Sequence, residues 1–331
     1  MSVAKLISVA DLHGDFDRAV RILVHANLID QETHAWIGGD STLVQTGDIV
    51  DRGSHSKQIY QLFFGLREQA LKVGGRVINL LGNHEVMNIK HDWRYVTAAD
   101  IAEFGGEEER AQAWSLNGWL GSQVLKFPVA IVVERVLFVH AGLLPEIVAR
   151  RSLDDLNEDT QKALAGEMQG TEARELLGPR GPVWARDYAI RGDASCERVG
   201  NVLSKMGANR MVVGHTIQRD FRVHARCGGR VILGDTAISQ SYGGAMTYLE
   251  HDEHGVTAVY PGTGERQSLL SSDVDPRPDP NFVTATAVVS VASAASLSWR
   301  PDLAALGIFI TGATFAVWRC RSSEKLQRHA T

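Results

Sequence analysis

Carboxylate, imidazole and amide side chains recur in short glycine-containing loops along the first part of this 331-residue chain. The first loop contains Asp11 and His13, the second contains Asp48, and the third contains Asn83 and His84. Side chains of these types, without cysteine, suit borderline and harder cations such as manganese, iron and zinc ions. The loops therefore indicate a metal centre built from residues that lie far apart in the sequence.

Two later loops add one histidine each, His140 before Ala141-Gly142 and His215 after Gly214. Each short motif alone is common in surface turns, but this ordered series, with every loop after an apolar run, indicates a shared site. Two catalytic ions about 3.5–4 Å apart need a common ligand, and the expected bridging carboxylate is Asp48. The remaining expected ligands divide between one ion (Asp11, His13) and the other (Asn83, His140, His215).

A pair of such ions predicts the hydrolysis of phosphate monoesters. The ions would lower the pKa of bound water and neutralise phosphate oxygens, so we expect direct in-line attack by a metal-bound hydroxide. Two alternatives would use the same residues. One is a nucleotide or diadenosine-polyphosphate hydrolase with different loops, and the other is a metal-binding scaffold without activity.

The elements that must position these loops alternate between strands and helices. Short apolar runs at 6–10, 42–46 and 76–81 predict buried strands, each ending where a metal-binding loop begins. Helical spacing of apolar residues predicts helices at 15–28 and 56–72. This alternation predicts an α/β fold in which the strand-end loops converge on one edge of a sheet.

The second half of the chain contains more predicted strands than the first. Residues 98–125 and 153–168 have helical patterns, and 129–139 predicts two strands around the turn Glu134-Arg135. Further short strands are expected at 211–213, 230–233, 245–249 and 256–260. The expected architecture is two packed mixed β-sheets flanked by helices, with a dimetal site at the strand-end loops.

A change in composition divides the chain into three parts. We expect a catalytic domain at 1–270, a proline-rich linker at 271–281 and a low-complexity tail at 282–331. Within the tail, residues 303–318 are uncharged and basic residues flank them. One reading of this segment is a membrane anchor, and the other is a loosely packed apolar tail, because its length falls short of the usual span.

Charge and cysteine content narrow the partners and the compartment. The net charge of −5 provides no basic field for nucleic acid. The cysteines, Cys196, Cys227 and Cys320, are too few and too scattered to predict a disulfide framework, so a reducing compartment is expected. The apolar run at 6–10 is too short for a signal peptide, and we expect a cytoplasmic protein, membrane-associated only if the tail is an anchor.

Three longer segments, at 10–15, 44–53 and 81–88, resemble those of the calcineurin-like metallophosphoesterases, in the phosphoprotein phosphatase branch. Within that branch the chain is most similar to the Shewanella-like protein phosphatases, and the segments at 93–96 and 241–244 support this subgroup. The resemblance extends from about residue 5 to residue 260. It implies the metallophosphoesterase fold, two metal ions (manganese, or iron and zinc) and phosphorylated proteins as substrates, on serine and threonine or on tyrosine.

The resemblance also implies roles for residues that spacing alone does not assign. His84 resembles the general acid that protonates the leaving oxygen, with Asp51 orienting its ring. Arg52 and Arg186 resemble the side chains that clamp the phosphate group, a task that suits a guanidinium because it can bind two oxygens at once. The chain departs from the family pattern at Ala141 and at 234–237, where the loop beneath the site is expected to shift.

Overall fold

The computed structural model describes residues 4–253 and 255–269, and two mixed β-sheets form its centre. In the six-stranded sheet, β1, β2 and β3 are parallel, and β9, β10 and β11 continue the sheet from β1 in antiparallel fashion. In the five-stranded sheet, β5, β6 and β8 are parallel, with antiparallel β4 and β7 at the edges. The strands are β1 (Leu6–Val9), β2 (Thr42–Gln45), β3 (Arg76–Asn79), β4 (Ala130–Val133), β5 (Val136–Val139), β6 (Arg210–Val213), β7 (His224–Arg226), β8 (Val231–Leu233), β9 (Tyr248–Asp252), β10 (Gly255–Tyr260) and β11 (Glu265–Ser268).

Alternation along the strands explains why the two sheets pack on each other. Because successive side chains point to opposite faces, each buried strand has one face toward the other sheet and one toward the helices. Leu6 and Val44 of the first sheet share a cluster with Phe138, Val212 and Ile232 of the second. Their neighbours in the same strands belong to the larger core that the helices cover (Ile7, Leu43, Leu137, Met211, Val231). The expected architecture of two packed mixed sheets flanked by helices is confirmed.

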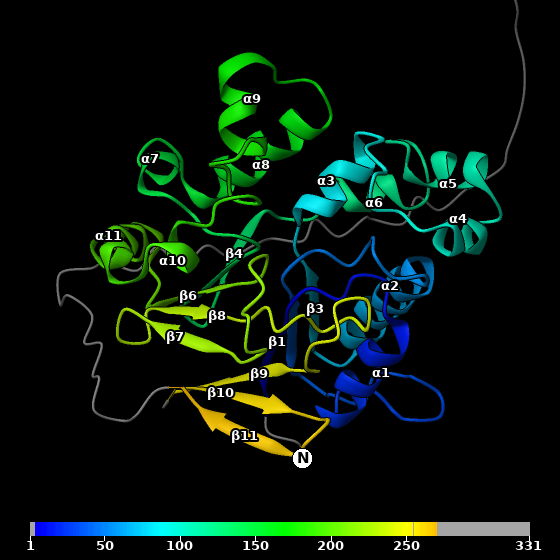
Figure 1. Cartoon of the computed structure of the whole chain (residues 1–331), viewed down its shortest axis with the longest axis horizontal. Helices are drawn as coiled ribbons and strands as arrows, with labels where there is room; N and C mark the ends of the chain where they lie inside the picture. Colours follow the sequence, from blue (N-terminus) through cyan, green and yellow to red (C-terminus); the bar gives the residue numbers. More distant parts are fainter. Residues whose placement is uncertain (1–3, 254, 270–331) are drawn as a thin grey trace, which may run out of the picture. The chain divides into compact units, whose positions relative to one another are not determined.

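Helices cover the outer faces of both sheets. Figure 1 shows α1 and α2 beside β1 to β3, and α11 beside β6 in the other half of the fold. The amphipathic helix α1 directs Ala19, Ile22 and Leu23 into the core, and the side chain of Asp15 caps its first turn. The helices are α1 (Phe16–His25), α2 (Ser56–Lys72), α3 (Asn83–Ile89), α4 (Ala98–Phe104), α5 (Glu107–Trp114), α6 (Gly121–Val124), α7 (Pro145–Val148), α8 (Leu153–Leu164), α9 (Gly170–Leu177), α10 (Asp187–Ile190), the 3-10 helix η1 (Gly192–Ser195) and α11 (Cys196–Met206).

Some elements differ from the sequence-based expectation. Residues 82–85 were expected to be a loop, but helix α3 begins at Asn83. The strand expected at 245–249 is β9, shifted toward the C-terminus. This strand contains the polar residue His251, which is buried and whose Nε2 lies 2.8 Å from Ser8 Oγ. Polar residues that pair across strands in this way hide the apolar pattern on which the expectation was based.

The expectation drawn from the cysteines also needs correction. Cys196, at the start of α11, forms a disulfide with Cys227, in the turn between β7 and β8. The two Cα atoms are 5.1 Å apart, although the residues are separated by 31 positions in the sequence. Wide separation along the chain was therefore no guide to pairing, because the second sheet and its covering helix bring the two segments together.

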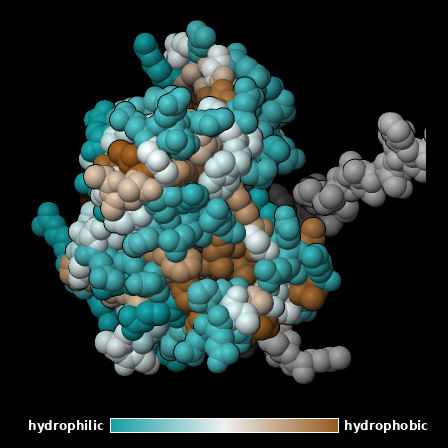
Figure 2. Space-filling view, turned by 90° about the vertical axis from the view of Figure 1, so that its right-hand side faces the viewer, coloured by the Kyte–Doolittle hydropathy of each residue, from teal (hydrophilic) through white to brown (hydrophobic). Residues whose placement is uncertain are grey.

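The surface of the described residues carries few large exposed hydrophobic side chains. The face in Figure 2 is mostly hydrophilic, and its hydrophobic residues form separate patches. The most exposed are Ile37, Leu71, Val73 and Ile190, each more than half accessible. Among the described residues, no helix is long and apolar enough to span a bilayer. The expected linker at 271–281, the tail at 282–331 and the candidate anchor at 303–318 lie outside the described residues.

Candidate metal centre

The residues expected to bind metal follow the carboxyl ends of parallel strands in both sheets. Asp11 comes two residues after β1, and Asp48 comes three residues after β2. His140 directly follows β5, and His215 comes two residues after β6. Because the two sheets are packed together, their strand-end loops meet at one place. The convergence predicted from the order of the motifs is therefore present.

Several residues in these loops have an unusual backbone conformation. His13, Asp48, Asp51, Arg52 and His215 all have positive φ angles, between 42° and 72°. Non-glycine residues adopt this region at a cost of roughly 1–3 kcal/mol each, and such strain gathers at functional sites. The surrounding fold must therefore hold these backbones in place to offset that cost.

Two glycines allow the loops to touch. A Cβ atom at Gly214 would lie 2.2 Å from Asp11 Oδ1, and one at Gly82 would lie 2.2 Å from Asp48 Oδ1. Real Cβ atoms do not approach other atoms this closely, so any side chain at either position would displace a carboxylate. The glycines that flank the motifs are explained by this close packing of one loop against the next.

Asp48 belongs to both of the compact groups of candidate ligands found among the described residues. One group contains His13, Asp48 and His84, and the other contains Asp48, His140 and His215, with the ligand atoms of each group within 4.8 Å of one another. Asp48 Oδ2 lies 3.8 Å from His13 Nε2 and 3.3 Å from His140 Nε2. A carboxylate between two groups of ligands is placed to bridge two cations.

The hydrogen bonds of the histidines determine which nitrogen faces the centre. Nδ1 of His13 lies 3.0 Å from the Val50 carbonyl oxygen, and Nδ1 of His140 lies 2.9 Å from that of Thr46. A carbonyl oxygen only accepts, so each Nδ1 carries a proton and each Nε2 is directed toward Asp48. This arrangement, in which a backbone carbonyl holds the ring, is the one that metal-binding histidines commonly use.

His215 and Asn83 also line the pocket that contains Asp48. Nε2 of His215 is buried and has no hydrogen-bond partner among the described residues. Burial lowers the pKa of His215 to about 2, with a further contribution from His140, so its ring is neutral and can donate a lone pair. Asn83 Oδ1 lies 2.9 Å from His140 Nε2. His215 Nε2 and Asn83 Oδ1 are therefore two further atoms with lone pairs among the residues of this pocket.

The buried carboxylates lie close together, and their mutual repulsion favours the binding of positive charge. Burial and the nearby charges of Asp235 and Asp48 raise the pKa of Asp11 well above its usual range. Burial also opposes the charged form of Asp48, but the imidazoles of His140, His84 and His13 hold its pKa well below the usual range. Burial raises the pKa of Asp235 to about 6. Several negatively charged carboxylates buried together, surrounded by nitrogen and oxygen donors and no sulfur, suit bound cations of the borderline or harder kind.

Asp11, expected as a ligand of the first ion, is buried and interacts with the charge of Asp48. It belongs to neither compact group, and its carboxylate oxygens accept hydrogen bonds from the backbone N–H of His215 at 3.0 and 3.2 Å. The structure therefore places Asp11 beside the centre, where it also supports the loop that carries a histidine. His84, by contrast, was not expected among the ligands, yet its Nε2 lies 3.9 Å from Asp48 Oδ2.

His84 has a second interaction that separates it from the other histidines. Its Nδ1 lies 2.6 Å from Asp51 Oδ2, and Asn88 donates to Asp51 Oδ1 at 3.0 Å. Burial lowers the pKa of His84, but the charge of Asp48 and the hydrogen bond with Asp51 outweigh this effect and raise the pKa overall. A carboxylate behind the ring thus favours a protonated imidazole whose Nε2–H points into the site.

Arg52 is held at the rim of the site by two tyrosines. Its guanidinium carbon lies 3.8 Å from the ring centre of Tyr95 and 5.7 Å from that of Tyr242. The backbone N–H of Arg52 donates to the Tyr95 carbonyl oxygen, and Ser241 Oγ donates to the carbonyl oxygen of Arg52. The Nε atom of Arg52 has no partner among the described residues. The guanidinium is therefore oriented and retains capacity to bind an anion.

Arg186 lies next to the loop that carries His215. Its Nη1 donates to the carbonyl oxygen of His215 at 3.1 Å and to Thr216 Oγ1 at 2.9 Å. Both arginines line a pocket of about 330 Å³, together with candidate ligands and aromatic residues (His13, Asp48, Asn83, His84, Tyr95, Trp184, His215, Thr216, Ile217, Asp235, Tyr242). The structure thus brings all of the residues predicted for catalysis to one pocket and its immediate walls.

Glu85 is a supporting residue that sequence reasoning did not single out. Its Oε2 accepts from the backbone N–H groups of Asp48 and Gly82, and its Oε1 accepts from Ile49 N–H and the Tyr60 hydroxyl, each at 2.8 Å. The carboxylate is fully buried. It therefore connects the loop after β2 to the loop after β3. Its position in the motif Gly82-Asn83-His84-Glu85 was the sequence feature that could have marked it as a supporting residue.

Replacing Glu85 with alanine is expected to lower the free energy of unfolding by about 3 kcal/mol or more, because three buried N–H groups lose their acceptor. Urea denaturation would measure this loss. The matched control is Tyr60→Phe, which removes a single hydrogen bond to the same carboxylate and should cost about 1 kcal/mol. Equal losses in the two variants would show that Glu85 does not hold the loops.

Three aromatic residues and one acid at the pocket were also not predicted as site residues. They are Tyr95, Trp184, Asp235 and Tyr242. Tyr95, Asp235 and Tyr242 lie within segments noted for their resemblance to the family or departure from it, and Trp184 lies two residues before Arg186. The three aromatic side chains do not mark a metal ligand or a phosphate clamp, and Asp235 stood outside the loops from which the ligands were predicted. Their position at the pocket depends on loops from both sheets, which the sequence does not place relative to one another.

Comparison with protein families gives one matching model. Residues 4–219 match the model of the calcineurin-like phosphoesterases. Shewanella-like protein phosphatase 1 of Plasmodium berghei is 30% identical over 77% of this chain and 74% of that protein. Shewanella-like protein phosphatase 2 of Arabidopsis thaliana is 28% identical over 71% of this chain and 72% of that protein.

Solved structures agree with this similarity. The cold-active protein-tyrosine phosphatase of a psychrophilic Shewanella species superposes with a TM-score of 0.71 at 26% identity. The match covers 81% of this chain and 81% of that one. The similarity thus extends across both sheets and the loops that carry the candidate ligands.

Proposed function

The chain belongs to the calcineurin-like phosphoesterase family, and from that premise we propose that it is a dinuclear metal-dependent phosphatase of phosphorylated proteins. It is a hydrolase, and the relatives named as phosphatases support phosphatase activity. The observation that carries the proposal of two ions is the position of Asp48, whose carboxylate belongs to two separate groups of buried ligands.

The proposed ligands divide around Asp48. His13, supported by Asp11, would hold one ion with Asp48. The other ion would be held by the second group, with Asn83 beside His140 as a further ligand (Asp48, Asn83, His140, His215). Oxygen and nitrogen ligands of this kind suit manganese, or iron with zinc. Such ions, when bound, neutralise phosphate oxygens and lower the pKa of water near neutral pH.

The protein's own side chains would bind the phosphate group and supply a proton. Arg52 and Arg186, which both line the pocket, would bind phosphate oxygens through their N–H groups. His84 would donate the proton on Nε2 to the oxygen of the leaving alcohol, since Asp51 favours the charged ring and fixes its direction. Asn88 would hold Asp51 in turn.

A phosphorylated protein side chain fits the pocket best. Its volume of about 330 Å³ is near the lower end of the range for small-molecule sites, which suits one phosphorylated side chain more than a dinucleotide. The partly buried rings of Tyr95 and Tyr242 form an aromatic wall beside Arg52. The relatives named as protein phosphatases, one of them a tyrosine phosphatase, support this substrate class.

Activity of the metal-loaded protein would test the proposed substrate class. We expect hydrolysis of phosphotyrosine, phosphoserine or phosphothreonine peptides with a kcat/KM at least about tenfold above that for diadenosine tetraphosphate, because the pocket accommodates a single phosphorylated side chain. Phosphate release would be measured on all four substrates under one condition. A clear preference for the dinucleotide would contradict the proposal and favour the nucleotide hydrolase.

A further inference from the structure

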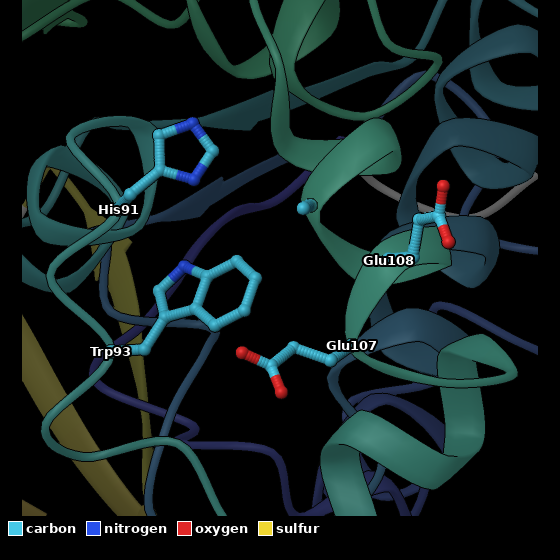
Figure 3. Close-up of a pocket in the computed structure, with 5 residues that line it drawn as sticks. His91, Trp93, Glu107 and Glu108 are labelled. Carbon is cyan, nitrogen blue, oxygen red and sulfur yellow. The ribbon is translucent and has the colours of Figure 1, made fainter. Parts of the chain in front are cut away.

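A second cavity, of about 520 Å³, lies outside the proposed catalytic pocket. Its lining residues are His91, Trp93, Glu107, Glu108 and Ala111. Figure 3 shows the ring of Trp93 facing helix α5, with the carboxylate of Glu107 directed from that helix toward the ring. An aromatic wall opposite carboxylates is an arrangement that recognises cations.

The charge of this cavity is negative and is not neutralised by its neighbours. Glu107 and Glu108 are exposed, and neither forms an ion pair with another residue in the described part of the chain. Of the two nearby arginines, Arg94 pairs with Asp92 at 2.7 Å. Arg110, whose guanidinium carbon lies 4.9 Å from the centre of the Trp93 ring, pairs through Nε with Asp100 at 2.9 Å, while its Nη1 and Nη2 have no partner among the described residues. The two glutamates are therefore available to a cationic ligand.

One short segment of the chain lines both this cavity and the catalytic pocket. Trp93 lines the cavity and Tyr95, two residues later, lines the catalytic pocket. Two residues of fully extended chain span at most about 7 Å. The segment is fixed at the catalytic end, because the Tyr95 carbonyl oxygen accepts from Arg52 N–H at 3.0 Å. A peptide bound with its phosphate at Arg52 would therefore reach the cavity within a few residues.

We propose that this cavity is a specificity subsite that binds the side chain of an arginine or lysine within about four residues of the phosphorylated residue. The inference rests on the proposed phosphoprotein function and adds a sequence preference to it. The guanidinium or ammonium group would lie between the Trp93 ring and the carboxylate of Glu107, with Glu108 as a second acid in the lining. An arginine fits best, because its planar group can stack on the indole while it donates to a carboxylate.

The first turn of α5 provides a matched control. Glu107, Glu108 and Glu109 are all exposed acids at the positive end of this helix, where acidic residues stabilise the helix dipole. Glu109 does not line the cavity, and its side chain lies against Gly105 and Gly106. A role in helix stability alone would apply to every one of these glutamates, whereas a role in recognition applies only to the first two.

The test compares phosphopeptides that differ only in the position of one arginine. We expect a kcat/KM about tenfold higher when arginine stands at the favoured position than when alanine does, since one partly exposed ion pair and one cation–aromatic contact would be gained. The double variant Glu107→Gln/Glu108→Gln should lose this preference, and Glu107→Lys/Glu108→Lys should reverse it toward an acidic residue. Glu109→Gln should retain it, and all variants should hydrolyse p-nitrophenyl phosphate at the original rate.

The outcomes separate this inference from the function on which it rests. An arginine preference that survives in the double variant, or no preference at any position, would overturn the subsite while leaving the phosphoprotein function standing. Hydrolysis of p-nitrophenyl phosphate without cleavage of any phosphopeptide would overturn both. An equal loss in Glu109→Gln would show that helix stability, and not recognition, explains the effect.

Discussion

Replacing Asp48 with asparagine is expected to remove bound metal and to lower kcat/KM by about 10³-fold or more, since metal ions supply several kcal/mol of transition-state stabilisation. The reason is the position of this carboxylate, which belongs to both groups of candidate ligands. Asparagine keeps the shape of the side chain but removes the charge that two cations would share. Metal content would be measured by mass spectrometry on purified protein, and turnover with p-nitrophenyl phosphate.

The same substitution provides its own check on folding. Asp48 Oδ1 also accepts from His84 N–H at 2.9 Å, so thermal unfolding must be measured beside metal content to separate local disorder from lost ligation. A matched variant is Asp51→Asn, at a buried carboxylate of the same loop that belongs to neither group of ligands, and it should keep its metal. Two tightly bound ions in Asp48→Asn would contradict the assignment of Asp48 as the bridging ligand.

Replacing His84 with asparagine is expected to slow turnover by about 10²–10⁴-fold, the usual contribution of a general acid, while the metal content stays close to normal. The loss should depend on the leaving group. An aryl phosphate whose leaving oxygen needs no proton should recover much of the rate, whereas an alkyl phosphate should not. Steady-state kinetics with a series of leaving groups would give this dependence as a slope.

The leaving-group series also distinguishes the two roles considered for His84, general acid and metal ligand. Its Nε2 lies 3.9 Å from Asp48 Oδ2, close enough for a role as a ligand, while its Nδ1 is held by Asp51. Asp51→Asn should reproduce part of the loss, because the ring would keep its place but lose the charge that favours its protonated form. Equal losses on activated and unactivated esters, together with lost metal, would identify His84 as a ligand.

Much of this site could be predicted because its signals are local. A short apolar run followed by a polar, glycine-containing turn predicts a strand end, whatever the rest of the chain does. Five loops of this kind, with Asp48 and His140 among their residues, were sufficient to predict a metal centre at one edge of an α/β fold. Helix α2 was predicted with the bounds that it has, because its apolar spacing is regular over Ser56–Lys72.

The tertiary structure decided the features that depend on contacts between distant segments. The sequence could not show that Asp11 supports the loop of His215, that Glu85 joins two loops, or that Cys196 pairs with Cys227. Nor could it show which nitrogen of each histidine faces the centre, since that depends on a carbonyl group elsewhere in the chain, as at His140 and Thr46. Residue types and local spacing determine the kind of chemistry, whereas the packing of two sheets determines which side chains meet, because packing is set by the burial of side chains across the whole fold.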